Sequence, residues 1–266
     1  MKIAIMGGDL RNLYLQVMLE KDGHNTYLYG FSKLNLGISS LYKALAAPII
    51  IGGIPFAKGT ELFAPYNERV EIDKIIQNIG NDKLLIGGNL GCLDLKCNFI
   101  DLLCYEQFLV KNAIPTSEGV VSLAINYTKN TIKDSSVIII GYGRIGSICA
   151  NLFAALGARV AVVVLEQKET LKTNFKGEVI LYRDINEYLL NFDIIINTPS
   201  QDVINHSNLQ YIKKDALIID VSSQPFGVNE EIEKDIKILR PRGLPAKVAP
   251  KSAALYIKEV ISSYLE

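Results

Sequence analysis

The 266-residue sequence lacks a charge excess, a long apolar run and a leader-like start. Lysine plus arginine number 28 and aspartate plus glutamate number 28, so the formal net charge is zero. Without a basic excess, nucleic acid is not an expected partner. The apolar runs fall short of the ~18 residues that a membrane span needs. The apolar start is also too short for a signal-peptide core. We therefore predict a cytoplasmic protein without nucleic acid or membrane partners.

Metal-binding residues are also scarce. The chain has only two histidines, and the spacing of its four cysteines matches no CxxC zinc pattern. In a cytoplasmic protein, cysteines remain reduced thiols. The histidines are His24 and His206, and the cysteines are Cys92, Cys97, Cys104 and Cys149. We predict buried structural thiols and no metal site.

Short β-branched runs alternate with helical stretches, and this alternation is typical of parallel α/β sheets. The pattern occurs twice, which predicts an α/β protein with two doubly wound, Rossmann-like domains. In the first half we expect strands at 2–6, 26–29, 48–51 and 84–86, and a helix followed by a short strand within 90–110. In the second we expect strands at 137–140, 160–165, 178–180, 193–197, 216–220 and 237–239, and a last helix near 252–264.

The second half begins near residue 114, where Thr116 or Ser117 can cap a new helix with Glu118 in its first turn. Further on, the run Gly141-Tyr142-Gly143-Arg144-Ile145-Gly146 follows an apolar strand and opens an amphipathic helix. In that context the glycines allow a tight turn and close approach to a diphosphate, whose charge the helix amino terminus attracts. A coincidental glycine turn is the alternative. We predict a dinucleotide site here.

Acidic and polar residues follow the neighbouring strands. Glu166, twenty residues beyond Gly146, can accept hydrogen bonds from the adenosine ribose and repel a 2′-phosphate, which favours NAD over NADP. It could instead be a solvated loop charge, and Lys168 could reverse the preference. The loops Asn197-Thr198-Pro199 and Asp220-Val221-Ser222 end later strands and should face the nicotinamide half, unless they are ordinary turns.

The first strand ends differently, in Gly7-Gly8-Asp9-Leu10-Arg11-Asn12. This turn lacks the dinucleotide spacing, and Asp9 would repel a diphosphate. We expect it to present Arg11 and Asn12 to a smaller ligand.

Several stretches together resemble the A subunits of dipicolinate synthases, and they span nearly the whole chain in order. They begin with the GGDxR start and the PTxEG segment. The matching strings are IMGGDLR (5–11), NAIPTSEG (112–119), GYGRIG (141–146), FAALGA (153–158), DVSSQP (220–225) and GLPAKVAPKSA (243–253).

The resemblance implies a pyridine-nucleotide oxidoreductase that works with a flavoprotein B subunit. The pair would oxidise a dihydrodipicolinate-type cyclic dicarboxylate to dipicolinate in the mother cell of a sporulating bacterium. It also implies the domain arrangement of 2-hydroxyacid dehydrogenases. Residues 1–113 plus 248–266 would form a flavodoxin-like substrate domain with a returning carboxyl-terminal helix, and residues 114–247 the dinucleotide-binding domain. Where the family often carries Arg and Ser, this chain has Leu165 and Glu166, which favours NAD.

A dicarboxylate substrate needs cations, and arginine can bind a carboxylate with two parallel hydrogen bonds. The candidates are Arg11, Arg242 and Lys251, with hydrogen bonds from Asn12, Thr116 and Ser117. Solvated surface charge is the alternative for each cation. No catalytic base is identified, since neither histidine lies in a matched motif. A D-2-hydroxyacid-dehydrogenase-like reductase and a non-catalytic NAD-sensing partner of a flavoprotein remain alternatives, and homo-oligomerisation stays open.

Overall fold

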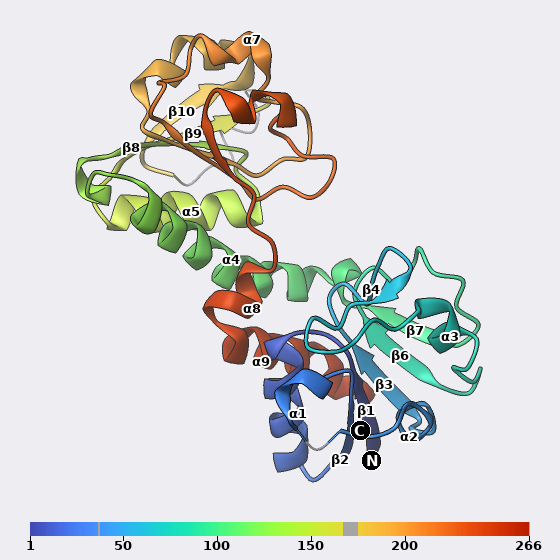
Figure 1. Ribbon diagram of the computed structural model, residues 1–266. Coiled ribbons are helices and arrows are strands. Elements are labelled where there is room, and N and C mark those ends of the chain that lie inside the picture. The colour runs from blue at the N-terminus through green and yellow to red at the C-terminus, as the bar shows by residue number, and fades with distance from the viewer. Residues whose placement is uncertain (37, 167–174, 266) are drawn as a thin grey trace. The chain divides into compact units, whose positions relative to one another are not determined.

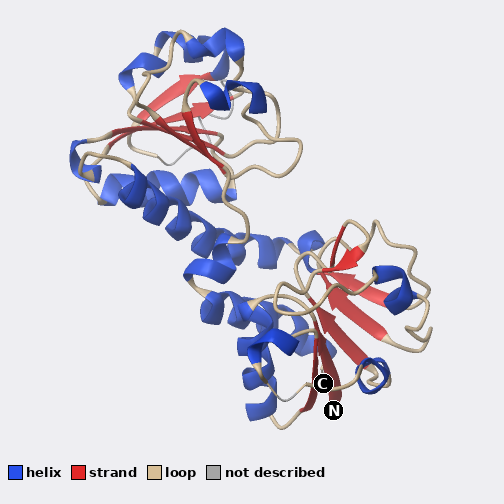
Figure 2. Ribbon diagram, viewed as in Figure 1, coloured by secondary structure: helices blue, strands red, loops and turns tan. Residues whose placement is uncertain are grey.

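A computed structural model describes residues 1–36, 38–166 and 175–265. The chain divides into two compact units, Met1–Asn112 with Ala249–Glu266, and Ala113–Val248 (Figure 1). Each unit holds one parallel sheet with helices on both faces (Figure 2). The predicted α/β class is confirmed. Lys168 lies outside the described residues, so the structure adds nothing to the expectation placed on it.

The sheet of the first unit has the strand order β2-β1-β3-β6-β7, and every neighbouring pair is parallel. In sequence order this is 2-1-3-4-5, the order of flavodoxin-type folds. The strands are β1 (Lys2–Met6), β2 (Asn25–Tyr29), β3 (Ile49–Gly52), β6 (Leu84–Gly87) and β7 (Asn98–Asp101), and a separate hairpin joins β4 (Ala57–Lys58) to β5 (Glu61–Leu62).

Helices cover both faces of this sheet because its strands are apolar on both sides. Ile3 and Ile5 of β1 pack toward α1 (Leu10–Lys21) and α9 (Pro250–Ile261), which also pack against each other. Ala4 and Met6 point to the opposite face, toward α2 (Leu41–Leu45) and α3 (Ile72–Ile76). Each fully buried large aliphatic side chain contributes about 1.5–3 kcal/mol of transfer free energy. The carboxyl-terminal helix is thus part of the core of the first unit.

The sheet of the second unit has the order β10-β9-β8-β11-β12-β13, again all parallel. In sequence order this is 3-2-1-4-5-6, the dinucleotide-binding order, which reverses direction between β8 and β11. Loops that leave the carboxyl ends of these two strands diverge, and ligands of such sheets lie there. The strands are β8 (Ser136–Ile140), β9 (Arg159–Val164), β10 (Glu178–Leu181), β11 (Ile194–Asn197), β12 (Leu217–Asp220) and β13 (Lys237–Leu239).

Alternate residues of β8 again serve two cores. Val137 and Ile139 pack with α4 (Glu106–Tyr127), α5 (Arg144–Ala155) and α8 (Leu244–Val248), whereas Ile138 and Ile140 pack with shorter elements on the other face. Those shorter elements are α7 (His206–Leu209), η4 (Tyr182–Glu187), η5 (Leu189–Asn191) and η6 (Glu230–Lys234). The remaining 3₁₀ helices are η1 (Ser32–Leu34), η2 (Leu102–Cys104), η3 (Ile132–Asp134) and η7 (Ser262–Tyr264).

The predicted order of elements within 90–110 is wrong. The strand β7 comes first, and the helix α4 begins only at Glu106. The leucines before β7 pack into the core from a loop, which gives them an apparently helical spacing. The carboxylate of Asp101 accepts the backbone N–H of Leu90 at 2.7 Å and that of Leu103 at 3.0 Å. These bonds give the backbone N–H groups of the loop the hydrogen-bond partners that they would otherwise find within a helix.

The predicted helix start at Thr116 or Ser117 is also wrong. Both residues lie in the middle of α4, which runs through Pro115. A proline at that point usually marks a helix start because it donates no backbone hydrogen bond. The residues before it also favour a helix, since Phe108 is buried and Leu109 packs against the same core. The helix therefore begins at Glu106 and passes the proline.

Candidate functional site

The glycine-rich loop connects β8 to α5, and two of its glycines are required by the packing of the loop itself. Gly141 has a φ of +88°, and a Cβ there would lie 2.5 Å from the Oγ1 of Thr198. A Cβ at Gly146 would lie 2.0 Å from the carbonyl oxygen of Gly141. Side chains at these two positions would therefore force the strand, the turn and the helix apart.

Gly143 differs from both of these glycines. It is the N-cap residue of α5, its φ of −83° suits any residue, and no side chain caps the helix there. Apart from its neighbours in the chain, no described residue comes within 4 Å of the place where its Cβ would be. The first N–H groups of α5 are therefore not capped by a side chain, and the helix dipole favours negative charge there.

The other three residues of the motif differ in how far they are buried. Tyr142 is half-buried and packs against Phe175 with ring centroids 6.2 Å apart. Burial raises the pKa of Tyr142. Arg144 is exposed at the first position of α5, and Ile145 joins the core beneath it.

The first unit fills the corresponding position with its own carboxylate. The turn after β1 places Asp9 at the N-cap of α1, where its Oδ1 accepts the backbone N–H of Arg11 at 3.1 Å. The guanidinium of Arg11 holds both oxygens of Asp9, at 2.9 and 2.8 Å, and also donates to the carbonyl of Ile54. Asn12 donates to the carbonyl of Gly52 at 2.9 Å. Arg11 and Asn12 are 3% and 2% exposed, so their polar groups stabilise the loops of their own unit.

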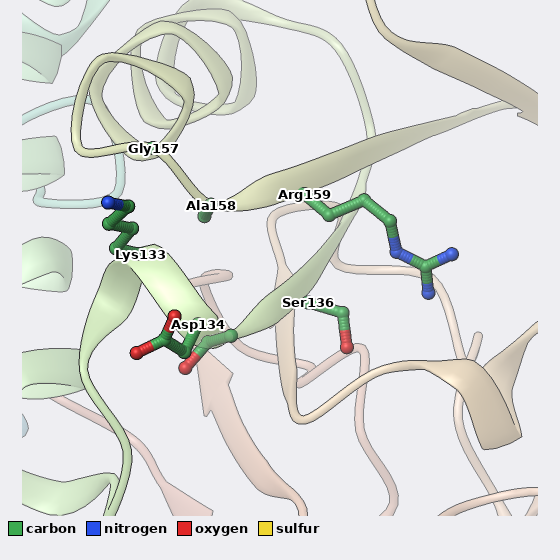
Figure 3. A pocket seen from close by; sticks show the side chains of 7 residues that line it. Lys133, Asp134, Ser136, Gly157, Ala158 and Arg159 are labelled. Atoms are coloured by element: carbon green, nitrogen blue, oxygen red, sulfur yellow. The ribbon is translucent and has the colours of Figure 1, made fainter.

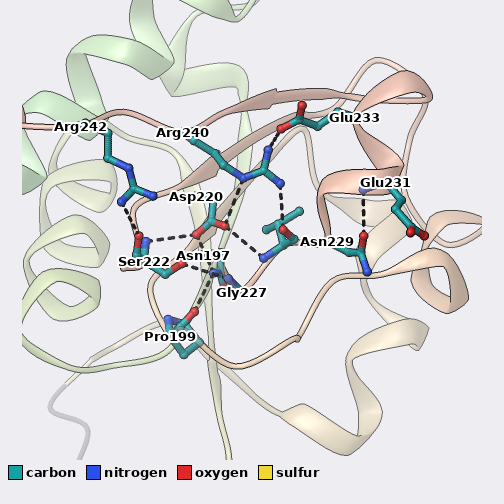
Figure 4. Close-up of polar contacts among 11 residues, drawn as sticks. Asn197, Pro199, Asp220, Ser222, Gly227, Asn229, Glu231, Glu233, Arg240 and Arg242 are labelled. Atoms are coloured by element: carbon teal, nitrogen blue, oxygen red, sulfur yellow. Dashed lines mark hydrogen bonds and ion pairs between the residues drawn. The ribbon is translucent and has the colours of Figure 1, made fainter. Parts of the chain in front are cut away.

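Two further loops of the second unit leave the same edge of its sheet as the glycine loop. Thr198 donates its Oγ1 hydrogen to the carbonyl of Ile140 at 2.9 Å, which joins the loop after β11 to the end of β8. Asn197 donates its Nδ2 hydrogens to Asp220 and to the carbonyl of Pro199, each at 2.9 Å (Figure 4). Both of these acceptors lack hydrogens, which fixes the orientation of the amide.

Asp220 is the centre of this polar cluster. Its carboxylate is buried, accepts the backbone N–H groups of Ser222 and Val228 at 3.1 Å each, and lies 3.9 Å from the Nε of Arg240. The Oγ of Ser222 accepts the N–H of Gly227 at 3.0 Å. The polar side chains of Asp220 and Ser222 therefore shape the loop after β12.

Glu166 is exposed and lies two residues beyond the end of β9. That is the end of the second strand of the dinucleotide-binding unit, where a ribose-binding acid is found in such folds.

The substrate candidates lie in different environments. Ser117 is buried in α4 and donates its Oγ hydrogen to the carbonyl of Ile145 at 3.3 Å, and Thr116 beside it is half-buried. Burial raises the pKa of the neighbouring Cys149 thiol to about 11, against the lowering effect of its hydrogen bond with Ser117. Lys251 is exposed in the first turn of α9, and Arg242 is exposed after β13.

The sequence interpretation missed Phe226 and Arg240. The guanidinium carbons of Arg240 and Arg242 lie 5.0 and 4.4 Å from the centre of the Phe226 ring. The Arg-Pro-Arg spacing directly after a strand is the signal that could have pointed to this pair. The aromatic platform comes from another loop and is not visible in that spacing.

Comparison with known proteins decides the family. Residues 2–92 match the model of the N-terminal domain of the dipicolinate synthase A subunit, and residues 111–235 match that of the D-isomer specific 2-hydroxyacid dehydrogenase NAD binding domain. The chain is 30% identical to the dipicolinate synthase A subunit of Bacillus subtilis (strain 168), covering 100% of this chain and 96% of that protein. The chain belongs to the family of dipicolinate synthase A subunits.

Solved structures of dipicolinate synthase A subunits agree over the same length. The Bacillus halodurans protein superposes with a TM-score of 0.88 at 25% identity, over 99% of this chain and 97% of that one. The Bacillus subtilis protein superposes with a TM-score of 0.86 at 29% identity, over 100% and 95%. The second unit of this family member is thus a nicotinamide-dinucleotide-binding domain of the 2-hydroxyacid dehydrogenase type.

A pocket of about 450 Å³ lies at the opposite edge of that domain's sheet. It surrounds the amino ends of β8 and β9 and is lined by Lys133, Asp134, Ser136 and Arg159 (Figure 3). Ligands of such sheets lie at the carboxyl ends of the strands, so this pocket is separate from the candidate dinucleotide site.

The described residues form neither a metal-binding cluster nor a membrane-spanning helix. Within them, no group of three or more His, Cys, Asp or Glu side chains lies close enough together to hold a metal ion. No helix in the same part of the chain has both the length and the apolar character needed to cross a membrane.

Proposed function

We propose that this chain is the pyridine-nucleotide-binding component of a dipicolinate synthase that acts in the mother cell during sporulation. Its substrate is a dihydrodipicolinate-type cyclic dicarboxylate, and its partner is a flavoprotein B subunit. The reaction removes one hydride from a ring carbon and one proton from a neighbouring carbon, which makes the ring aromatic. One observation carries the proposal: in a chain of this family, the N-cap of α5 is Gly143, no side chain caps the helix there, and a Cβ at that glycine would have open space.

The cofactor in this proposal is NAD rather than NADP. When bound, the nicotinamide ring supplies the carbon that accepts the hydride. Glu166 follows the second strand of this domain, where an acid that accepts hydrogen bonds from the ribose hydroxyls is expected, and its charge disfavours a 2′-phosphate. The amide groups at the start of α5 bind the diphosphate, and the loops after β11 and β12 shape the nicotinamide end.

In the same proposal the main task of the protein is to orient the substrate. The reaction gains its driving force from aromatisation, so orientation matters more than a strong acid. The histidines fit this view. His24 lies 3.4 Å from the amino terminus through its Nδ1, and His206 pairs with Glu231 at 3.3 Å. Neither histidine lies in one of the strings that the chain shares with dipicolinate synthase A subunits. This arrangement disfavours a reductase that protonates a carbonyl through histidine.

The experiment that tests the proposal compares three preparations. This chain, its flavoprotein partner and the mixture of the two are each incubated with the dihydrodipicolinate-type substrate and NAD. Dipicolinate and reduced nucleotide are then measured. We expect dipicolinate and NADH to form in equal amounts, with the highest rate in the mixture.

Two results would reject the proposal. Reduction of a 2-oxo acid with NADH by this chain alone, with no turnover of the cyclic dicarboxylate, would identify a 2-hydroxyacid dehydrogenase. Binding of NAD without any contribution to turnover would identify a nucleotide-sensing protein.

A further inference from the structure

Two arginines follow β13, and they lie on the same aromatic ring. Arg240 comes directly after the strand and Arg242 two residues later, and both guanidinium groups face Phe226 (Figure 4 shows the arginines). A guanidinium stacked on an aromatic face keeps its edge available for hydrogen bonds. The two side chains differ in how much of that edge the protein already uses.

The charge of Arg240 is neutralised within the domain. Its Nη2 donates to the carbonyl of Val228 at 2.8 Å, and its guanidinium forms ion pairs with Asp220 and Glu233. Its side chain is only 12% exposed. Arg240 therefore stabilises the loop between β12 and β13.

The charge of Arg242 is not neutralised in this way. Its Nη1 donates to the carbonyl oxygen of Ser222 at 3.0 Å, a neutral acceptor, and the residue is exposed. Among the residues that the structure describes, no carboxylate lies within ion-pair distance of its guanidinium. The Phe226 ring and the Ser222 carbonyl hold the cation in place and leave its other N–H groups to a ligand.

The position of Arg242 determines which part of a ligand it meets. Ser222 lies two residues beyond β12, and β12 pairs with β11, which pairs with β8. Arg242 is therefore attached to the same edge of the sheet as the glycine loop, on the β12 side of the point where the strand order reverses. In a sheet of this order the nicotinamide half of the cofactor lies on that side.

We infer that Arg242 binds a carboxylate of the substrate beside the nicotinamide. This inference rests on the proposed function and deepens it. The substrate class is a compound whose carboxylate is attached to a carbon next to the one that is oxidised. A planar guanidinium binds such a carboxylate with two parallel hydrogen bonds, which fixes the plane of the ring.

The other cations are less suited to this role. Arg11 is buried, its charge is balanced by Asp9, and its Nε and Nη2 groups donate to Asp9 and to the carbonyl of Ile54. Lys251 is an exposed point charge on a flexible stem, and an ammonium group cannot fix the plane of a carboxylate as a guanidinium does.

The test measures the binding of dipicolinate and of picolinate, its monocarboxylate analogue, to the full chain in the presence of NAD. The variants are Arg242→Gln and Arg242→Lys, with Arg69→Gln as the matched control. Arg69 has a side chain that is 89% exposed and lies in the first unit. Isothermal titration calorimetry gives the affinities, and thermal melting checks the fold.

Arg242→Gln should weaken dipicolinate binding by at least about tenfold, because a charge-assisted pair is lost. NAD affinity and the melting temperature should stay close to those of the wild type. The wild type should prefer dipicolinate over picolinate, and the glutamine variant should lose most of this preference, because it lacks the cation proposed for one of the two carboxylates. The dipicolinate affinity of Arg242→Lys should lie between those of the wild type and Arg242→Gln. The dipicolinate affinity of Arg69→Gln should match that of the wild type.

Two failures are distinguishable. If the wild type binds dipicolinate and Arg242→Gln keeps both its affinity and its preference, the role of Arg242 is refuted while the proposed function stands. If the wild type binds NAD but not dipicolinate, the proposed substrate is wrong, and the inference fails with it.

Discussion

The replacement Gly143→Val tests the cofactor cradle with little cost to the fold. The residue has extended backbone angles, and its new side chain would meet no described atom within 4 Å of the Cβ position. The loss of glycine at an N-cap should cost about 1 kcal/mol at most. In the complex, the valine would occupy the place of the diphosphate. Losing two amide–phosphate hydrogen bonds at about 1.5 kcal/mol each weakens binding by about 3 kcal/mol, more than 100-fold in Kd.

The assay is titration of NAD against the wild type and three variants, with urea unfolding in parallel. Gly91→Val is the matched control, since that glycine also has open space at its Cβ position but lies in the first unit. Gly146→Ala is the opposite control. Its Cβ would lie 2.0 Å from a backbone oxygen, so it should lower the free energy of unfolding by about 1–3 kcal/mol. Unchanged NAD affinity in a folded Gly143→Val variant would refute the site.

Three further predictions concern charged groups. Glu166→Ser should improve NADP binding relative to NAD by about tenfold, and an unaltered ratio of the two dissociation constants would exclude a ribose-binding role. Arg11→Ala should lower the free energy of unfolding by about 3–5 kcal/mol, because Asp9 is left buried without its counter-charge; urea denaturation measures this, and a loss below about 1 kcal/mol would contradict it. Burial raises the pKa of Asp193, but hydrogen bonds, first from Lys213, outweigh it and hold that pKa below its ordinary value. The ionised Asp193 therefore stabilises the fold above its ordinary pKa, and this stabilisation is lost as the pH falls through its lowered pKa. Asp193→Asn should flatten the acid side of a curve of unfolding free energy against pH. An unchanged acid side would count against this role of Asp193.

Most of the strands were predictable because they are short apolar runs bounded by turn residues, whereas β7 was expected after a helix and the hairpin of β4 and β5 was not predicted. The glycine loop was predictable because its spacing requires a strand before it and a helix after it, and both are present. The start of α4 was not predictable from Pro115, because the stability of a helix also depends on the packing of its apolar face. Phe108, which is buried in the core of the first unit, supplies such packing before the proline.

The environment of a charged side chain was the hardest feature to predict. In the sequence, Arg11, Arg240 and Arg242 are all cations beside turn residues. Asp9 lies two residues before Arg11 and pairs with it at 2.8 Å, whereas only the fold places Asp220 beside Arg240, at 3.9 Å. Such partners come from residues that tertiary structure brings together, and spacing along the chain does not reveal all of them.

The two units begin with the same elements, a buried strand, a glycine turn and a helix. They differ in the residue at the N-cap of that helix, and this residue decides whether the helix start can bind an anion. At the N-cap of α1 the chain provides Asp9, whose charge Arg11 balances; at the N-cap of α5 it provides Gly143 and open space. A diphosphate at α1 would have to displace a buried ion pair, and breaking such a pair costs about 3–5 kcal/mol. That cost is as large as the gain from the two amide–phosphate bonds considered above. We therefore expect no dinucleotide in the first unit, and we expect its buried arginine to stabilise the fold. A substrate carboxylate must then depend on a cation that the fold leaves unbalanced, and Arg242 meets that requirement.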